Sequence, residues 1–356
     1  MVVERLRHIL ENDGRLRSRV EQTIEEAAES NPDTRTNPVR SLEDLYAWLE
    51  RFLTVMPWEG IESGGKGQGL FQRIDQSIGY QYYLFGDLQY EPKIAEWLKQ
   101  YNTAWAERLN SSESWNDTYF EMLRSDPLFE LDGNKYELSA NWRCWNDFFA
   151  RRLAGEYNGA VIDAECGLTS PAEGRVSQWM SIGEDNMLQM PAAIKTTTVV
   201  NVADLMGRGQ YSGSFAGGWF CHVTLDIYNY HRFHAPCAGT IVDIQEIDGM
   251  LTGGGRIIWN AEEHRYRYEQ QDNIGYQMME KRVVIVIEQS KNRFAEGTKN
   301  KEQGHLIAVI PVGVAQVGSI RLNEDIKTGS EVRQGQELGC FLCGGSDVIV
   351  MKEKDK

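Results

Sequence analysis

Two glycines followed by a serine, Gly344, Gly345 and Ser346, lie close to the carboxyl end of the chain. Glycine adopts backbone conformations that a side chain would forbid, so this hydroxyl can be held against the carbonyl group that precedes it. Attack there shifts the acyl group from nitrogen to oxygen, and elimination followed by hydrolysis leaves a pyruvoyl group. The reaction needs a general base and a carboxylate that orients the base. A plain glycine turn is the alternative.

Two histidines, His231 and His234, are candidates for acid-base work because histidine titrates near neutral pH. Their aromatic segment ends at Pro236 and is typical of a strand entering a turn, where side chains three residues apart point to opposite faces. A purely structural role for both histidines is one alternative. A zinc site is another, and it would draw on Cys221, His222, His231, His234 and Cys237.

Two further motifs favour ordinary turns over chemistry. Residues 60–66 fit the first part of a phosphate-binding loop, but Gly67 stands where Ser or Thr would hold magnesium, and a helix precedes the motif where a strand is needed. Cys340 and Cys343 form one CxxC pair, whereas zinc usually needs a second pair. With no export signal at the start of the chain, we expect no disulfides among the six cysteines.

The elements that must position these residues fall into two regions. Residues 1–125 have helical patterning, with helices predicted at 41–53, 70–85 and 94–109. The aromatic residues of the last helix recur along one face, which indicates core packing. From Gly159 onward, apolar runs alternate with glycine-rich turns, and strands are predicted at 219–225, 239–247, 283–287, 305–318 and 347–351, with an exposed loop at 295–304.

We therefore predict an α+β protein. An all-α domain over 1–140 precedes a β-rich domain over 141–356, with an antiparallel or mixed, sandwich-like sheet. The chain has 356 residues, 41% of them apolar and 25% charged, which is typical of a globular protein. No apolar run approaches the roughly 20 residues of a membrane helix. We expect a cytoplasmic protein with no transmembrane segment.

The net charge of −15 makes nucleic acid an unsuitable partner, because phosphate binding needs a basic surface. The charge is uneven, since residues 1–140 carry 15 basic and 25 acidic residues. An acidic amino-terminal region argues against docking on anionic lipid through that region.

Five separated motifs in one order resemble the phosphatidylserine decarboxylase family, whose members are pyruvoyl enzymes that cleave themselves at a Gly–Ser bond. Residues 148–153 (FFARRL) resemble the entry motif of the family, and 170–174 (SPAEG) resemble its SPADG turn. Residues 230–236 (YHRFHAP) are similar to its YHRxHxP motif, 312–320 to its VGAxxVGSI strand, and 339–346 to its cleavage segment. Together these motifs span about residues 142–351.

The resemblance implies self-cleavage between Gly345 and Ser346, which would divide the chain after residue 345. Ser346 would become the pyruvoyl cofactor, and no metal is implied. His234 would act as base on Ser346, oriented by Glu173. His231 would protonate the product carbanion or position the carboxylate of the substrate. A Schiff base to the pyruvoyl group would release carbon dioxide, and we expect the neighbouring residues Tyr230 and Phe233 to bind substrate.

Three residues depart from the pattern of the family. Glu173 stands where Asp is usual, so its carboxylate reaches further. Asn229 stands where Asp is common. Asp347 stands where Thr is usual and places a negative charge beside the cleaved bond, which predicts slower self-processing.

The helical region resembles the extra domain of tryptophan decarboxylases in the same superfamily. With no hydrophobic anchor, we expect a soluble amino acid as substrate, an aromatic one being an option, ahead of phosphatidylserine, which would give phosphatidylethanolamine. Contact with a membrane would be peripheral and only for the lipid, and a homodimer is left open. A non-catalytic binding module and a zinc hydrolase are further alternatives.

Overall fold

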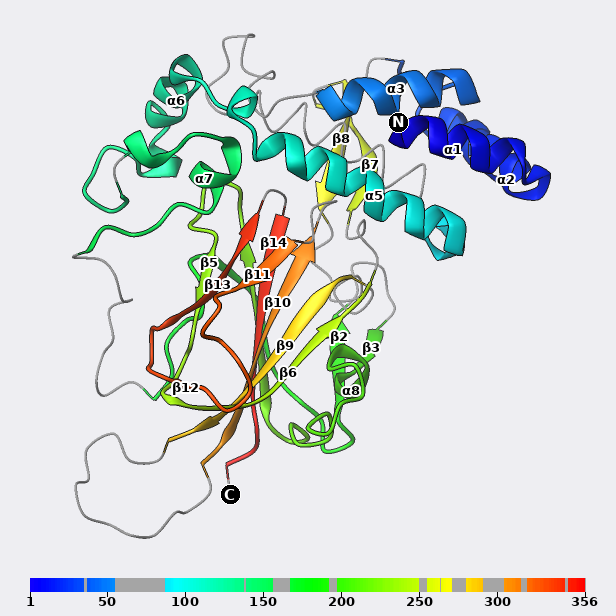
Figure 1. Cartoon of the computed structure of the whole chain (residues 1–356). Coiled ribbons are helices and arrows are strands. Elements are labelled where there is room, and N and C mark those ends of the chain that lie inside the picture. The colour runs from blue at the N-terminus through cyan, green and yellow to red at the C-terminus, as the bar shows by residue number, and fades with distance from the viewer. Residues whose placement is uncertain are drawn as a thin grey trace, which may run out of the picture.

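The computed structural model describes most of the chain (Figure 1). Several predicted features lie outside the described residues: the turn at 60–66, the helix at 70–85, most of the loop at 295–304, Cys343 and Gly344. The described residues are 1–34, 37–54, 87–137, 139–155, 167–191, 197–249, 255–262, 264–270, 280–290, 304–314, 319–342 and 345–355.

The amino-terminal part is helical (Figure 1). Local sequence explains where several helices begin, because Asp13 and Asn116 accept backbone hydrogen bonds as N-caps and Pro92 opens the longest described helix. The helices and 3₁₀ turns are α1 (Val2–Glu11), α2 (Gly14–Ser30), α3 (Leu42–Thr54), η1 (Asp87–Tyr90), α5 (Pro92–Leu109), η2 (Ser112–Ser114), α6 (Asp117–Arg124), η3 (Pro127–Phe129), η4 (Ser139–Asn141) and α7 (Trp145–Phe149).

Helix α5 organises this part, since α1 and α3 both pack on it. The indole of Trp97 donates to the carbonyl oxygen of Val2 at 2.8 Å, and the hydroxyl of Tyr101 donates to that of Leu49 at 2.7 Å. The predicted helices at 41–53 and 94–109 are confirmed as α3 and α5, and the aromatic face of α5 is buried as expected.

The rest of the chain is built mainly of strands. These are β1 (Arg175–Ser181), β2 (Met187–Pro191), β3 (Thr197–Asn201), β4 (Trp219–Leu225), β5 (Arg232–His234), β6 (Gly239–Ile247), β7 (Gly255–Asn260), β8 (Arg265–Gln270), β9 (Arg282–Gln289), β10 (Leu306–Val314), β11 (Ser319–Leu322), β12 (Glu331–Val332), β13 (Glu337–Leu342) and β14 (Gly345–Lys352). A short helix, α8 (Val202–Leu205), follows β3.

The described strands form a seven-stranded antiparallel sheet in the order β1-β4-β14-β10-β9-β6-β12. A three-stranded sheet has the order β11-β13-β5, and β2-β3 and β7-β8 are two-stranded. Strand β14, which carries Ser346, is therefore central, between β4 and β10. The predicted α+β fold is confirmed.

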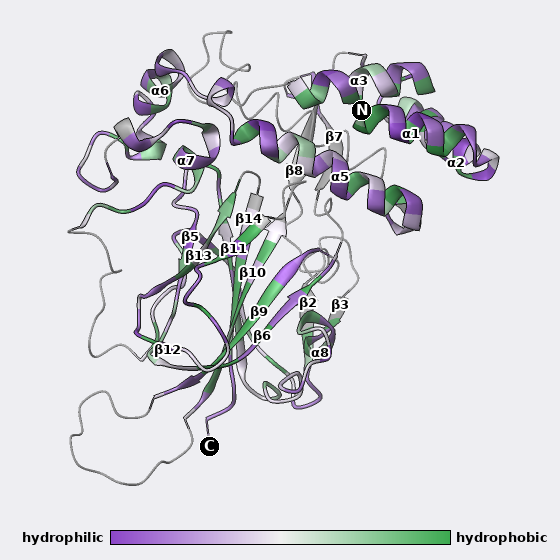
Figure 2. Ribbon diagram, viewed as in Figure 1, coloured by the Kyte–Doolittle hydropathy of each residue, from purple (hydrophilic) through white to green (hydrophobic). Residues whose placement is uncertain are grey.

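Both faces of the large sheet are buried, which is why its central strands are nearly continuous apolar runs (Figure 2). One face, with Val223, Val309 and Val350, packs with β5, β13 and the helices in one continuous core. The other face, with Ile310 and Ile349, packs with α8 and the β2-β3 hairpin. Burying such side chains contributes about 1.5–3 kcal/mol each.

Among the described residues, one hydrophobic core contains buried side chains from both the helical part and the strands. A domain boundary near residue 140 stays a prediction. The described helices include none that combines the length and the apolar character needed to cross a bilayer.

Candidate active site

Ser346 lies at the start of β14, inside the large sheet. Its neighbours across the sheet are Gly313 on β10 and Leu225 on β4, and its exposed fraction is 2%. A buried hydroxyl needs a hydrogen-bond partner, because water cannot provide one.

That partner is His231. Its Nδ1 lies 2.8 Å from Oγ of Ser346. The imidazole is fully buried, and the ring of Phe149 stacks on it with centroids 3.8 Å apart. Burial, with the positive charge of Arg151 as a second cause, lowers the pKa of His231 to about 3. The imidazole is therefore neutral near pH 7, and Nδ1 can accept the serine proton.

Arg151 holds the turn that leads to His231. Its Nη2 donates to the carbonyl oxygens of Tyr228 at 2.7 Å and Asn229 at 3.0 Å. The guanidinium is fully buried and lies over the ring of Tyr136. No carboxylate in the described part of the chain forms an ion pair with it, so its charge acts on its surroundings, His231 included.

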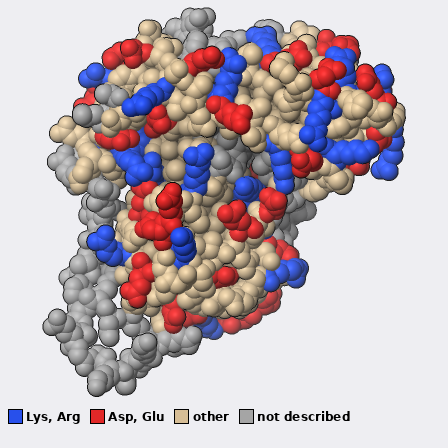
Figure 3. All heavy atoms as spheres, in the orientation of Figure 1, with Lys and Arg blue, Asp and Glu red and all other residues tan. Residues whose placement is uncertain are grey.

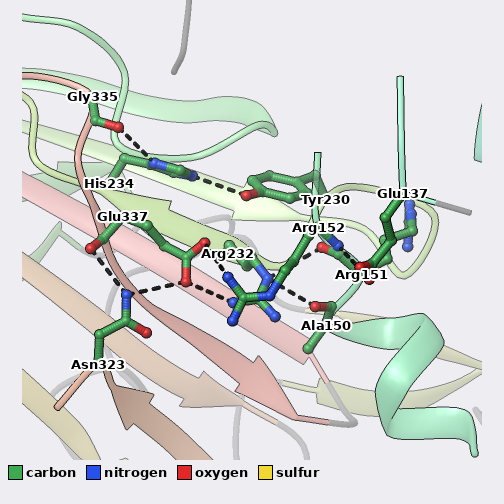
Figure 4. A network of polar contacts seen from close by, with 10 residues as sticks. All are labelled: Glu137, Ala150, Arg151, Arg152, Tyr230, Arg232, His234, Asn323, Gly335 and Glu337. Carbon is green, nitrogen blue, oxygen red and sulfur yellow. Dashed lines mark hydrogen bonds and ion pairs between the residues drawn. The ribbon is translucent and has the colours of Figure 1, made fainter. Parts of the chain in front are cut away.

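The expectation that His234 contacts Ser346 is wrong for the uncut chain, because His234 has other partners. Its Nδ1 lies 2.9 Å from the carbonyl oxygen of Gly335, and its Nε2 lies 3.1 Å from the hydroxyl of Tyr230 (Figure 4). Residues three apart in an extended chain face opposite sides, so the two histidines have different partners. Burial lowers the pKa of His234.

Glu173 does not orient His234 in the uncut chain, which is a second correction. Its Oε2 lies 2.8 Å from Nζ of Lys135, and the amide of Asn229 lies 3.5 Å from Oε1. Burial opposes the charge of Lys135, but its contacts with Glu130 and Glu173 outweigh that effect and leave its pKa raised. A cation from the helical region thus competes for the carboxylate, and the catalytic roles of Glu173 and His234 stay predictions.

The two residues predicted to bind substrate are buried in the uncut chain. Phe233 is fully buried and its ring lies 5.2 Å from that of Phe341. Tyr230 is 4% exposed, and burial raises the pKa of its hydroxyl. Their contact with substrate remains a prediction.

The SPAEG segment packs beside the second histidine. The amide of His234 donates to the carbonyl oxygen of Pro171 at 2.7 Å, and Thr169 and Pro236 are joined by a backbone bond of 2.9 Å. A Cβ at Gly174 would lie 2.5 Å from the carbonyl oxygen of Thr224, so only glycine fits there.

A polar network ties β5 to β13 and to the end of α7 (Figure 4). Arg232 donates through Nε to the carbonyl oxygen of Ala150 at 2.8 Å and through Nη1 to Oε1 of Glu337 at 2.7 Å. The amide of Asn323 donates to the same carboxylate at 3.1 Å. These contacts fix the segment that carries both histidines.

The residues considered for zinc have separate partners. His231 lies against Ser346, His222 against Asp347, and His234 against Tyr230. Within the described ranges, no three His, Cys, Asp or Glu side chains are grouped so as to hold a metal ion. Cys340 is a free thiol whose pKa is raised by burial.

Sequence reasoning missed Phe149 and Arg151 as site residues, although both lie in the FFARRL motif. Their place in that motif was the available signal. No sequence pattern indicated the contact of Glu337 with Arg232, because it joins strands more than 100 residues apart in the sequence.

Comparison with known proteins establishes the family. A family model described as phosphatidylserine decarboxylase matches residues 145–356. This chain belongs to the phosphatidylserine decarboxylase family. The resemblance drawn from the five motifs is thereby confirmed, and the family is one of pyruvoyl-dependent carboxy-lyases, the enzyme class that the motifs led us to expect.

Three relatives illustrate the similarity. The chain is 27% identical over 265 residues to phosphatidylserine decarboxylase proenzyme 2 of Oryza sativa subsp. japonica, covering 74% of this chain and 37% of that protein. It is 27% identical to a phosphatidylserine decarboxylase proenzyme of Fusobacterium nucleatum, over 64% of this chain and 66% of that one. It is 28% identical to phosphatidylserine decarboxylase proenzyme 3 of Schizosaccharomyces pombe, and the match covers 64% of this chain and 20% of that protein. The chain thus spans less than two thirds of each relative.

The expectation of a soluble amino acid as the leading substrate is wrong, because these relatives are named for phosphatidylserine. The expectation relied on the lack of a hydrophobic anchor, on the added helical region and on the negative net charge of residues 1–140. Net charge does not describe how charges are laid out, and Figure 3 shows Lys and Arg interspersed with Asp and Glu on the face in view. The family also disfavours the binding-module and zinc-hydrolase alternatives.

Proposed function

We propose that this chain is a proenzyme that cleaves itself between Gly345 and Ser346 and then decarboxylates phosphatidylserine to phosphatidylethanolamine. The observation that carries the proposal is the buried contact of 2.8 Å between Oγ of Ser346 and Nδ1 of His231, at the serine of the family's cleavage motif. The names of the relatives support both the proenzyme and the lipid.

We infer that His231 starts the cleavage. Its neutral imidazole takes the hydroxyl proton while Oγ of Ser346 bonds to the carbonyl carbon of Gly345. The C–N bond then breaks, and the proton passes to the amide nitrogen of Ser346. Loss of the Cα proton and cleavage of the Cβ–Oγ bond free the carboxylate of Gly345. Water then replaces the nitrogen, which leaves as ammonia.

Ser346 and its surroundings fit the pyruvoyl group that the family implies, because the hydroxyl to be converted is buried against a neutral base. When present, this group supplies a ketone that withdraws electrons from the substrate as its carboxylate leaves. Phe149 and His231 exclude water from this place, which favours loss of a charged carboxylate. His231 remains beside the converted residue and can return a proton to the product.

The proposed substrate is a membrane lipid, so the enzyme would work at a membrane surface. On the face that Figure 3 shows, Lys and Arg lie among Asp and Glu over the helical part, so this face is not uniformly acidic toward anionic lipid.

Release of carbon dioxide tests the proposal. The purified protein is given vesicles that contain phosphatidylserine and, separately, free serine, tryptophan and tyrosine. We expect release from the vesicles alone and none from a Ser346→Ala variant. Release only from free amino acids would contradict the lipid assignment.

A further inference from the structure

A second buried polar pair lies on the opposite face of β14 from Ser346. Oδ2 of Asp347 lies 3.2 Å from Nε2 of His222 on β4, and both side chains have an exposed fraction of 0%. Most of their neighbours on this face are apolar, among them Ile310 and Ile349, and Thr224 lies directly opposite Asp347. The carboxyl group of Asp347, which we expected to place a negative charge beside the cleaved bond, thus lies against an imidazole.

Glu280 belongs to the same buried cluster. It is fully buried, and among the described residues neither of its carboxylate oxygens has a hydrogen-bond partner. Burial, with the charge of Asp347 as a second cause, raises the pKa of Glu280 well above its usual value. Asp347, and not Glu280, is the carboxyl group that lies against His222.

The apolar pattern of β14 leaves its register poorly specified. Val348 and Val350 lie on one face, and Ile349 and Met351 lie on the other. A slip of two residues along β4 and β10 keeps each side chain on its own face, and it moves only the polar residues at the ends of β14 into apolar places, Lys352 and Glu353 in one direction or Ser346 and Asp347 in the other. Asp347 is a polar residue on the face of β14 that it shares with Ile349 and Met351. A slip of β14 along β4 would change the distance between Asp347 and His222.

We propose that the contact between His222 and Asp347 sets the register of β14 and thereby places Ser346 against His231. This deepens the function proposed above and depends on it. Buried polar pairs are best attested as devices that fix register.

Strand β14 depends most on this contact after cleavage. The 11 residues from Ser346 to the end of the chain are then held without a covalent link on their amino-terminal side. A polar anchor one residue from the new end keeps the reacting residue opposite Gly313 and Leu225. His222 and Asp347 are thus positioning residues.

Disulfide trapping reads the register directly. Cys221 on β4 is a free thiol and lies opposite Val350. A Val350→Cys variant reports the register of the structure, whereas Val348→Cys and Lys352→Cys report slips of two residues in either direction. Cross-strand neighbours approach closely enough for a disulfide to form under mild oxidation.

The reporters are combined with the double variant His222→Val/Asp347→Val, in which an apolar pair replaces the polar one without leaving a buried charge. We expect it to lose the cross-link at residue 350, to gain one at residue 348 or 352, and to cleave about tenfold more slowly because fewer molecules hold Ser346 in place. Ile349→Val, an apolar change on the same strand and face, should leave both readings as in the parent.

If the double variant fails to fold, Asp347→Val is compared with Asp347→Asn, whose oxygen can still accept from His222. We expect Asp347→Asn alone to retain the cross-link at residue 350. Retention of that cross-link in the double variant or in Asp347→Val overturns the proposal, whatever the cleavage rate. If the parent does not cleave, the proposed function fails, and cross-linking of the uncut Ser346→Ala chain still decides the register.

Discussion

The serine hydroxyl and the imidazole that face each other in the core are shut off from water. Because His231 is buried near the charge of Arg151, its neutral form dominates at neutral pH. A neutral base in contact with the hydroxyl is the state that cleavage requires. The same depressed pKa makes the fold sensitive to acid.

We predict that the uncut Ser346→Ala chain loses stability as the pH falls below 6.5, the ordinary pKa of histidine. Below that value the unfolded chain binds a proton at His231 that the folded chain, with its pKa of about 3, does not bind. This difference in proton binding lowers the free energy of unfolding by about 2 kcal/mol between pH 7 and pH 5. Urea unfolding at both values, with and without His231→Gln, measures the difference. Equal losses in the two proteins would refute the assignment.

At this scale the sequence motifs singled out Ser346 and both histidines as candidates but did not indicate that His231 is the one that lies against the serine. The order of residues in YHRFHAP does not say which ring faces β14. That choice follows from the turn before β5, which Arg151 holds through the carbonyl oxygens of Tyr228 and Asn229. The contact of Glu173 with Lys135 likewise joins two regions whose packing the sequence pattern does not reveal.

At the scale of elements, the small sheet β11-β13-β5 carries the histidine segment. Its strands are short. A strand was expected in the histidine segment that contains β5, but β13 was not predicted, because such strands owe their shape to pairing rather than to their own sequence. In contrast, β4 and β6 match their predicted ranges residue for residue. The Arg232–Glu337 pair holds β5 to β13.

Removing Glu337 tests this support. Glu337→Ala leaves Arg232, which is 7% exposed, without its carboxylate. We expect the free energy of unfolding of the uncut chain to fall by about 2–4 kcal/mol, after allowing for partial exposure of the pair. Glu331→Ala, at an exposed site on β12, is the control and should cost less than about 0.5 kcal/mol. Similar losses in both variants would show that the pair contributes little.

At the scale of the whole molecule, one hydrophobic core joins the helices to the large sheet. Phe148 on α7 contacts Trp115 and Phe129 from the helical region, while its neighbour Phe149 stacks on His231. The change from helical to strand patterning was visible in the sequence. The continuity of the core was not, because periodicity indicates which face is buried but not what covers it.

A shared core predicts that the uncut chain unfolds as a unit. Calorimetry of Ser346→Ala should give one thermal transition, and Phe148→Ala should lower its midpoint without splitting it, because truncating a buried Phe costs about 3–5 kcal/mol. Two separate transitions would show that the helical and β-rich parts are energetically independent.

Intact mass during incubation of the freshly purified protein tests the central claim most directly. We expect the full chain to give way to fragments 1–345 and 346–356, the short one bearing a carbonyl group at its start. His231→Gln should slow this conversion by about 100-fold or more, and more than His234→Gln does. A parent chain that stays whole, or a Ser346→Ala variant that still divides at this bond, would show that Ser346 is not the site of self-cleavage.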